Sequence, residues 1–98
     1  MIIYCAHKYS GDRDNIKKCG DILRRLQIEH KENCYISPLH NFEYLDYEDI
    51  PKVDFMQICL DLLQMSDKVL VLTDLSDGMK QEIKLARLLE IPIEYLKK

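Results

Sequence analysis

The segment that most constrains the fold is residues 68–74, where four consecutive apolar residues, Val69 to Leu72, are not interrupted by any polar residue. A strand with one face in water alternates apolar and polar side chains, whereas a strand covered on both faces is continuously apolar. Parallel sheets carry helices on both faces. We therefore predict that residues 68–74 form a central strand of a parallel sheet.

The other segments alternate between strand-like and helix-like patterns. Residues 2–6, 34–38 and 91–96 are short apolar runs typical of strands. Apolar residues at spacings of three and four predict helices from Asp12 or Asp14 to about residue 30, from Pro51 to Met65 and from Met79 to Glu90. This order predicts an α/β fold: a small flavodoxin-like or Rossmann-like three-layer sandwich, with about three helices and a four-stranded parallel sheet in the order 2-1-3-4.

Composition places the chain in a broad class and excludes several functions. Its 98 residues predict a single domain, 1–98, because two domains would each be too small to bury a core. Hydrophobic residues make up 47% and charged residues 32%, which excludes a disordered chain. The net charge of -3 gives no reason to expect binding of a DNA or RNA duplex. Without a membrane-length apolar run or a signal peptide, we expect a cytoplasmic protein that does not enter a membrane.

The cysteines are expected to be buried free thiols rather than disulfides or metal ligands. Cys5, Cys19, Cys34 and Cys59 all lie in apolar stretches, and a reducing compartment keeps thiols free. No Cys/His cluster has zinc spacing, and the Gly-rich motifs G-x-x-x-x-G-K-[ST] and G-x-G-x-x-G are absent. We therefore expect neither a metal nor a cofactor.

Two loops carry the residues that could do chemistry. Doubly wound sheets bind ligands outside the carboxyl ends of the strands where the strand order reverses, here between the first and third strands. On one side the chain supplies Tyr4, His7, Lys8, Tyr9, Ser10 and Gly11, and on the other Asp74, Ser76, Asp77, Gly78, Met79 and Glu82. We expect the two loops to face each other across one crevice.

Each of these loops has two interpretations. Ser and Gly before a helix can direct a hydroxyl and backbone N–H groups at an anion, but plain helix capping requires the same residues and is the commoner role. Glu82 either makes a favourable charge–dipole contact or acts as nucleophile or general base. Asp74 could orient a hydroxyl or supply an acid. The acidic and aromatic stretch 39–50 is long for a loop, and we expect it to wall a site or an interface.

The motifs together resemble a known family. They are Ile3-Tyr4-x-Ala6-His7-x-Tyr9-Ser10-Gly11, Ile36-Ser37-Pro38, Leu62-Leu63-x-x-x-Asp67-x-Val69, Asp74-x-Ser76-x-Gly78-Met79-x-x-Glu82-Ile83-x-x-Ala86 and Ile91-Pro92-Ile93. This set resembles the small nucleoside 2-deoxyribosyltransferase-like proteins, most closely the phage and bacterial group called DUF4406. The resemblance implies a nucleoside or nucleotide ligand and a homodimer or higher homo-oligomer whose subunits share the site.

The same resemblance implies roles for individual residues. Glu82 matches the nucleophile that attacks the anomeric carbon of the sugar, and Tyr4 matches a tyrosine that helps to place it. The Ser10-Gly11 and Ser76–Gly78 loops match segments that hold sugar or phosphate. The enzymes also carry an aspartate on the helix before the third strand, where this chain has Cys59, with Asp61 two residues further on.

The sequence leaves three candidate functions open. The first is processing of the N-glycosidic bond of a nucleoside or nucleotide, of deoxyribosyltransferase or N-glycosidase type, in which a carboxylate traps the oxocarbenium-like sugar. The second is non-catalytic binding or sequestration of a nucleotide or nucleotide-derived signal, conceivably by a phage protein in a conflict with its host. The third is an adaptor module that acts through its helix surfaces.

Overall fold

The computed structural model describes residues 1–45 and 48–96, and its strands form the predicted parallel sheet. The strands are β1 (Ile2–Ala6), β2 (Cys34–Ile36), β3 (Lys68–Val71) and β4 (Ile93–Tyr95). They lie in the order β2-β1-β3-β4, and every neighbouring pair is parallel. Tyr4 on β1 pairs with Ile36 on one side and Val69 on the other. The predicted order 2-1-3-4 is therefore confirmed.

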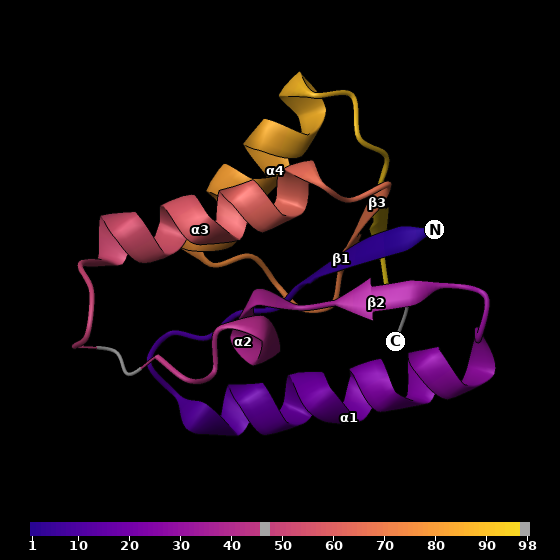
Figure 1. Ribbon diagram of the computed structural model, residues 1–98, viewed down its shortest axis with the longest axis horizontal. Coiled ribbons are helices and arrows are strands. Elements are labelled where there is room, and N and C mark those ends of the chain that lie inside the picture. Colours follow the sequence, from indigo (N-terminus) through magenta and orange to yellow (C-terminus); the bar gives the residue numbers. More distant parts are fainter. Residues whose placement is uncertain (46–47, 97–98) are drawn as a thin grey trace.

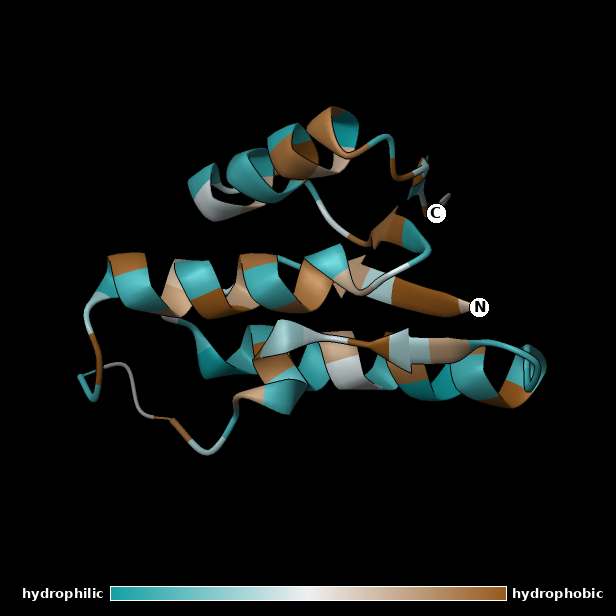
Figure 2. Ribbon diagram, turned by 45° about the horizontal axis from the view of Figure 1, so that its top comes forward, coloured by the Kyte–Doolittle hydropathy of each residue, from teal (hydrophilic) through white to brown (hydrophobic). Residues whose placement is uncertain are grey.

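Helices cover both faces of this sheet, as the continuous apolar run in β3 predicted. The helices are α1 (Arg13–Glu29), α2 (Pro38–Asn41), α3 (Lys52–Gln64) and α4 (Asp77–Leu88). Figure 1 shows α3 and α4 on one side of the sheet and α1 and α2 on the other. The longer helices are amphipathic, and Figure 2 shows them as alternating brown and teal bands around largely brown central strands. The result is a three-layer α/β sandwich.

Alternation along β1 divides the core between the two faces. Tyr4 and Ala6 pack with side chains of α3 and α4, including Leu63. Ile3 and Cys5 point to the opposite face, where they pack with residues of α1 and α2. Successive side chains of a strand point to opposite faces, so this single strand anchors both layers. Tyr4 consequently stands on the same face as α4.

Several boundaries differ from the predicted ones, and β4 has only Ile93–Tyr95 of the predicted 91–96. The short helix α2 begins at Pro38, which suits the first position of a helix, and takes in the first residues of the stretch 39–50. Strand β2 ends two residues earlier than predicted, at Ile36. Strand β3 ends at Val71, although the Leu72 N–H still donates to the Ala6 carbonyl oxygen at 2.9 Å. Helix α4 begins at Asp77 rather than Met79, because Ser76 caps it.

The cysteines are free, and three of the four are buried as predicted. The prediction of burial is wrong for Cys34, which is exposed at the start of β2. This strand has only three residues and lies at the edge of the sheet, so it is less covered than β1. Within 1–45 and 48–96, no helix combines the length and the apolar character that crossing a membrane would require.

Candidate functional site

A cleft of about 640 Å³ lies at the carboxyl ends of β1 and β3, where the strand order reverses. Its polar wall comes from the two predicted loops: His7, Tyr9, Ser10 and Gly11 after β1, and Ser76, Asp77, Gly78, Met79 and Glu82 before and within α4. Of the residues predicted for the crevice, Tyr4, Lys8 and Asp74 do not line the cleft. The two loops thus face each other as the topology predicted.

The rest of the lining is largely apolar and comes mostly from residues 38–45 and 50–56, which also contribute the charged Glu43 and Lys52. Phe42 and Phe55 lie in it together, and their rings meet edge to face with centroids 6.2 Å apart. Pro38, Leu39, Leu45 and Ile50 extend the same wall. The stretch 39–50 therefore forms part of a cleft wall, in agreement with the expectation for it. The cleft has one side suited to polar groups and one suited to a planar or apolar group.

Among the residues that the structure describes, Glu82 is the one buried carboxylate that lines the cleft. Only 6% of the residue is exposed, and its Oε2 atom forms no hydrogen bond within the described residues. Burial raises the pKa of the carboxyl group to about 7, and the nearby Tyr4 hydroxyl lowers it in part. Because α4 begins at Asp77, Glu82 lies in the second turn, where a charge–dipole contact is weaker than in the first. A buried carboxylate oxygen that forms no hydrogen bond is instead suited to receive a ligand.

Tyr4 and Cys59 surround this carboxylate from two other elements. Tyr4 is fully buried, its hydroxyl forms no hydrogen bond in the described part of the chain, and its pKa is raised by burial and by Glu82. Cys59 on α3 lines the cleft, and its pKa is raised to about 12 by burial and by Glu82. Both groups therefore keep their protons at neutral pH. Strand β1, helix α3 and helix α4 each contribute one member of this group, here called the Glu82 cluster.

Asp61, the nearest carboxylate on α3, does not join the Glu82 cluster. It is exposed and accepts a hydrogen bond from Gln57 Nε2 at 3.0 Å on the outer side of the helix. Two residues along a helix turn a side chain by about 200°, so Asp61 and Cys59 point in opposite directions.

His7 presents a fixed acceptor to the cleft. Its Nδ1 lies 2.7 Å from the Lys8 carbonyl oxygen, and since a carbonyl only accepts, Nδ1 carries the proton. The pKa of His7 is lowered, mainly by burial, which keeps the ring neutral at pH 7. Nε2 is then an acceptor. A neutral histidine of this kind can accept a hydrogen bond from a ligand hydroxyl.

Lys8 and Asp74 connect the two loops outside the cleft. The Lys8 ammonium lies 3.0 Å from an Asp74 carboxylate oxygen, and the Lys8 N–H donates to Thr73 Oγ1 at 3.1 Å. The Asp74 side chain is mostly exposed. This pair holds the end of β1 beside the end of β3.

Backbone geometry shapes both loops. Ser10 and Gly11 have φ angles of 51° and 73°, and the Asp12 N–H closes the turn onto the Tyr9 carbonyl oxygen at 2.9 Å. Two successive left-handed residues suit Gly but strain Ser, and such strain is often found at functional sites. On the other loop, the Met79 N–H donates to the Ser76 hydroxyl at 3.3 Å. A Cβ at Gly78 would lie 2.7 Å from the Met56 side chain, so the glycine lets α3 approach α4.

The sequence patterns did not single out Phe42, Phe55 and Met56 as cleft residues. Phe42 lies in the stretch 39–50, which has no clean periodicity, whereas Phe55 and Met56 lie on the predicted helix from Pro51 to Met65, whose pattern does not show which of its residues face a cleft. Cys59 was singled out only through the family resemblance. Within the described ranges, no group of three or more His, Cys, Asp or Glu side chains is arranged to hold a metal ion.

Comparisons with known proteins agree with the architecture. A 2-deoxyribosyltransferase from Bacillus psychrosaccharolyticus, described as a biocatalyst for nucleoside synthesis, is 18% identical with a TM-score of 0.65, covering 97% of this chain and 71% of its own. A 2-deoxyribosyltransferase from Leishmania mexicana is 17% identical with a TM-score of 0.71, covering 97% of this chain and 63% of its own. These likenesses confirm the fold that the resemblance implied. No significant match was found among curated proteins.

A family model matches residues 1–96, nearly the whole chain. It is the model of DUF7768 rather than of DUF4406, the group expected from the motifs. The chain therefore belongs to the family described as Domain of unknown function (DUF7768).

Proposed function

We propose that this protein processes the N-glycosidic bond of a nucleoside or nucleotide, with Glu82 as the nucleophile. The observation that carries the proposal is the buried Glu82 carboxylate, whose Oε2 atom has no hydrogen-bond partner in the described residues, on the wall of a cleft at the strand-order reversal. The deoxyribosyltransferase fold supports this class of substrate but, at 17% and 18% identity, does not by itself establish an activity.

In the proposed reaction, the ionised Glu82 oxygen attacks the anomeric carbon and the carbon–nitrogen bond breaks, its electron pair leaving with the base. A glycosyl ester forms. Water then displaces Glu82 in a hydrolase, or the nitrogen of a second base displaces it in a transferase. The leaving base takes a proton from solvent, since Cys59 keeps its own and the other carboxylates that line the cleft in the described part of the chain, Glu43 and Asp77, are exposed.

The remaining cleft residues have roles in binding. Tyr4 positions the nucleophile and moderates its pKa. Nε2 of His7 accepts a hydrogen bond from a sugar hydroxyl. The Ser10-Gly11 turn and the start of α4 at Ser76–Gly78 hold sugar or phosphate with N–H groups that lack helical partners. The apolar wall around Phe42 and Phe55 receives the base.

Incubation of the purified protein with deoxynucleosides and their monophosphates, with and without an acceptor base, tests the proposal. We expect chromatography to detect free or exchanged base for the wild type and at least a hundredfold less for Glu82→Gln. The matched control is Glu90→Gln, which changes an exposed glutamate in the turn that follows α4. This variant should keep full activity. Equal turnover in wild type and Glu82→Gln would contradict the assignment.

The second candidate is binding or sequestration of a nucleotide or nucleotide-derived signal without turnover. The observation that favours it is the neutral thiol of Cys59, at the position where the deoxyribosyltransferases that the motifs resemble carry an aspartate, so that Glu82 has no second buried carboxyl group beside it among the described residues. It predicts calorimetric binding of a nucleotide by wild type and Glu82→Gln alike, with no base released. The motifs resemble the phage and bacterial DUF4406 group, and this candidate function includes a role in a conflict between a phage and its host.

We also propose that two or more copies of the chain associate and share the cleft. Two strongly exposed apolar side chains, Tyr44 and Val53, belong to the stretch that forms the apolar wall, and they are 77% and 74% exposed. Apolar groups beside a cleft mouth favour a protein partner.

A further inference from the structure

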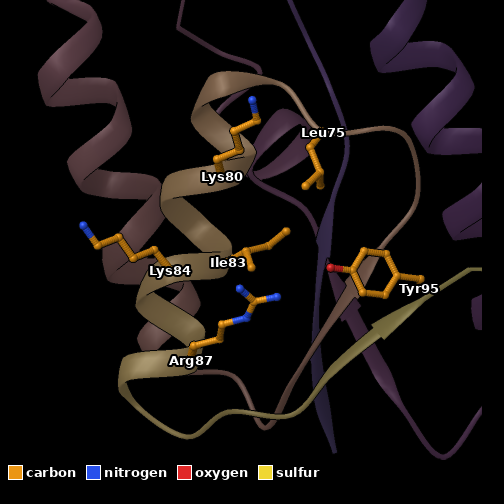
Figure 3. A pocket seen from close by; sticks show the side chains of 6 residues that line it. All are labelled: Leu75, Lys80, Ile83, Lys84, Arg87 and Tyr95. Atoms are coloured by element: carbon orange, nitrogen blue, oxygen red, sulfur yellow. The ribbon is translucent and has the colours of Figure 1, made fainter.

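A second pocket, of about 230 Å³, lies between α4, the loop before it and β4. Figure 3 shows its lining: Leu75, Lys80, Ile83, Lys84, Arg87 and Tyr95. None of these residues lines the cleft. The spacing of the four helical residues, 80, 83, 84 and 87, places them on one face of α4, about 140° around the helix from the face that carries Gly78, Met79 and Glu82. The pocket is therefore independent of the Glu82 cluster.

The side chains of this pocket form an apolar floor with a basic border. In Figure 3, Leu75 and Ile83 point into the space between α4 and the last strand, and the Tyr95 hydroxyl points toward α4. The guanidinium group of Arg87 extends into the same space, on the side that faces Tyr95. In Figure 3 the ammonium groups of Lys80 and Lys84 point away from the space between α4 and the last strand, on flexible stems long enough to fold back over a ligand.

The charges around the pocket are almost all positive. No carboxylate is among its lining residues. Within residues 1–45 and 48–96, Lys84 and Arg87 form no ion pair, and Lys80 has only the exposed Asp77, at 3.9 Å. Glu94 on the adjacent strand is neutralised by its ion pair with Lys68. A cluster of three cations on a chain with a net charge of -3 creates a local positive potential that attracts anions.

We propose that this pocket binds a small phosphate monoester that carries a planar ring, such as a nucleoside monophosphate or an aryl phosphate. The Arg87 fork pairs with two phosphate oxygens, and Lys80 and Lys84 close over the phosphate from the rim. The ring of the ligand lies against Tyr95 and Leu75. A volume equal to about eight water molecules fits one phosphate and one ring, not a polymer segment.

Titration of the ¹⁵N-labelled 98-residue chain, followed by amide chemical shifts, tests this. AMP and phenyl phosphate are the two ring-bearing probes, and inorganic phosphate is the probe without a ring. We expect saturable shifts at Lys84, Arg87 and Tyr95, with Arg87→Gln weakening binding at least about tenfold. Tyr95→Ala should remove the preference of the pocket for phenyl phosphate over inorganic phosphate. Saturation by AMP alone would assign a nucleotide, and saturation by both ring-bearing probes would assign the broader class.

The matched control is Arg24→Gln, which removes an exposed arginine from α1 on the other side of the sheet. Equal weakening by this variant would overturn the site in favour of diffuse charge attraction. The absence of saturable shifts at these amides, or shifts caused by an oligonucleotide but not by the small probes, would also overturn it. Shifts confined to His7, Gly78 and Glu82 would support the cleft and reject this pocket, whereas failure of the base-release assay leaves the pocket proposal unaffected.

Discussion

Glu82 holds a proton in a pH range where an exposed glutamate has lost it. Its pKa is about 7 in the folded chain and 4.5 ordinarily, so between these values the folded state binds a proton that the unfolded state does not. The stabilising contribution of this group is present below pH 4.5 and is lost as the pH rises through 7. Between pH 4 and pH 8 we expect wild type to lose about 3 kcal/mol of stability relative to Glu82→Gln.

Urea unfolding of both proteins at the two pH values measures this difference. Glu29→Gln, which changes an exposed glutamate on α1, controls for general charge effects and should follow wild type at both pH values. Parallel pH profiles for wild type and Glu82→Gln would show that the carboxylate is not buried as described.

Cys59 is the residue at which acid catalysis can be introduced. Cys59→Asp places a carboxyl group beside Glu82, and because two neighbouring carboxylates resist ionising together, one keeps a proton that it can give to the leaving base. We expect base release to rise about a hundredfold, or to become measurable where wild type shows none. Cys59→Asn is similar in shape but has no acidic proton, so a similar gain in that variant would refute the explanation.

At the scale of elements, α4 depends on the cap that sets its first turn. The Ser76 hydroxyl accepts a hydrogen bond from the Met79 N–H, one of the donors that a helix cannot satisfy internally. Ser76→Ala should therefore cost about 1 kcal/mol in the free energy of unfolding, while Ser76→Asp, which also caps well, should cost little. Denaturation midpoints of the three proteins measure this, and equal losses for Ala and Asp would show that capping is not the role of the side chain.

The strands could be predicted from the sequence because their signals are local. Val69 to Leu72 is continuously apolar, and helix-like segments separate the strands, which determines the sheet order through right-handed crossovers. Helix α2 could not be predicted because four residues make little more than one helical turn, too few for an apolar spacing to repeat, and the one local signal, Pro38, also ends a strand. The start of α4 was predicted late because Ser76, Asp77 and Gly78 suit a turn as well as a cap.

The Glu82 cluster depends on the whole molecule, and local patterns could not predict it. It requires that β1 turns Tyr4 toward α4, that α3 turns Cys59 inward, and that α4 begins early enough to bury Glu82. Each condition concerns the register of one element against another, which periodicity does not specify. The predicted crevice followed from topology alone, whereas the proximity of these three side chains required the packed structure.

Burial across the molecule predicts a sharp division among the thiols. Cys34 is exposed, whereas Cys5, Cys19 and Cys59 are buried with raised pKa values, about 12 for Cys5 and Cys59. We expect one thiol to react rapidly with an aromatic disulfide reagent and three to react on the order of a hundredfold more slowly. Cys34→Ser should abolish the fast phase, and denaturant should release all four. A second fast thiol in the native protein would contradict the described core.

The proposed association of copies leads to the last prediction. Tyr44 and Val53 expose apolar side chains beside the wall of the cleft, and a stable dimer buries about 800 Å² on each partner, which would cover both. Sedimentation velocity should therefore detect a dimer in the wild type, and Val53→Asp should convert it to a monomer with weakened nucleotide binding. Residue 53 lies in the first turn of α3, where a carboxylate is favourable, so this variant should still fold.

Met65→Asp is the matched control, because Met65 is 70% exposed but lies at the opposite end of α3. It should leave the dimer intact. A wild type that sediments as a monomer at every concentration, or equal dissociation by Met65→Asp and Val53→Asp, would rule out an interface at the cleft. If instead Val53→Asp dissociates the dimer but nucleotide binding is unchanged, the copies associate without sharing the cleft, because a shared wall cannot be removed without exposing the ligand to solvent.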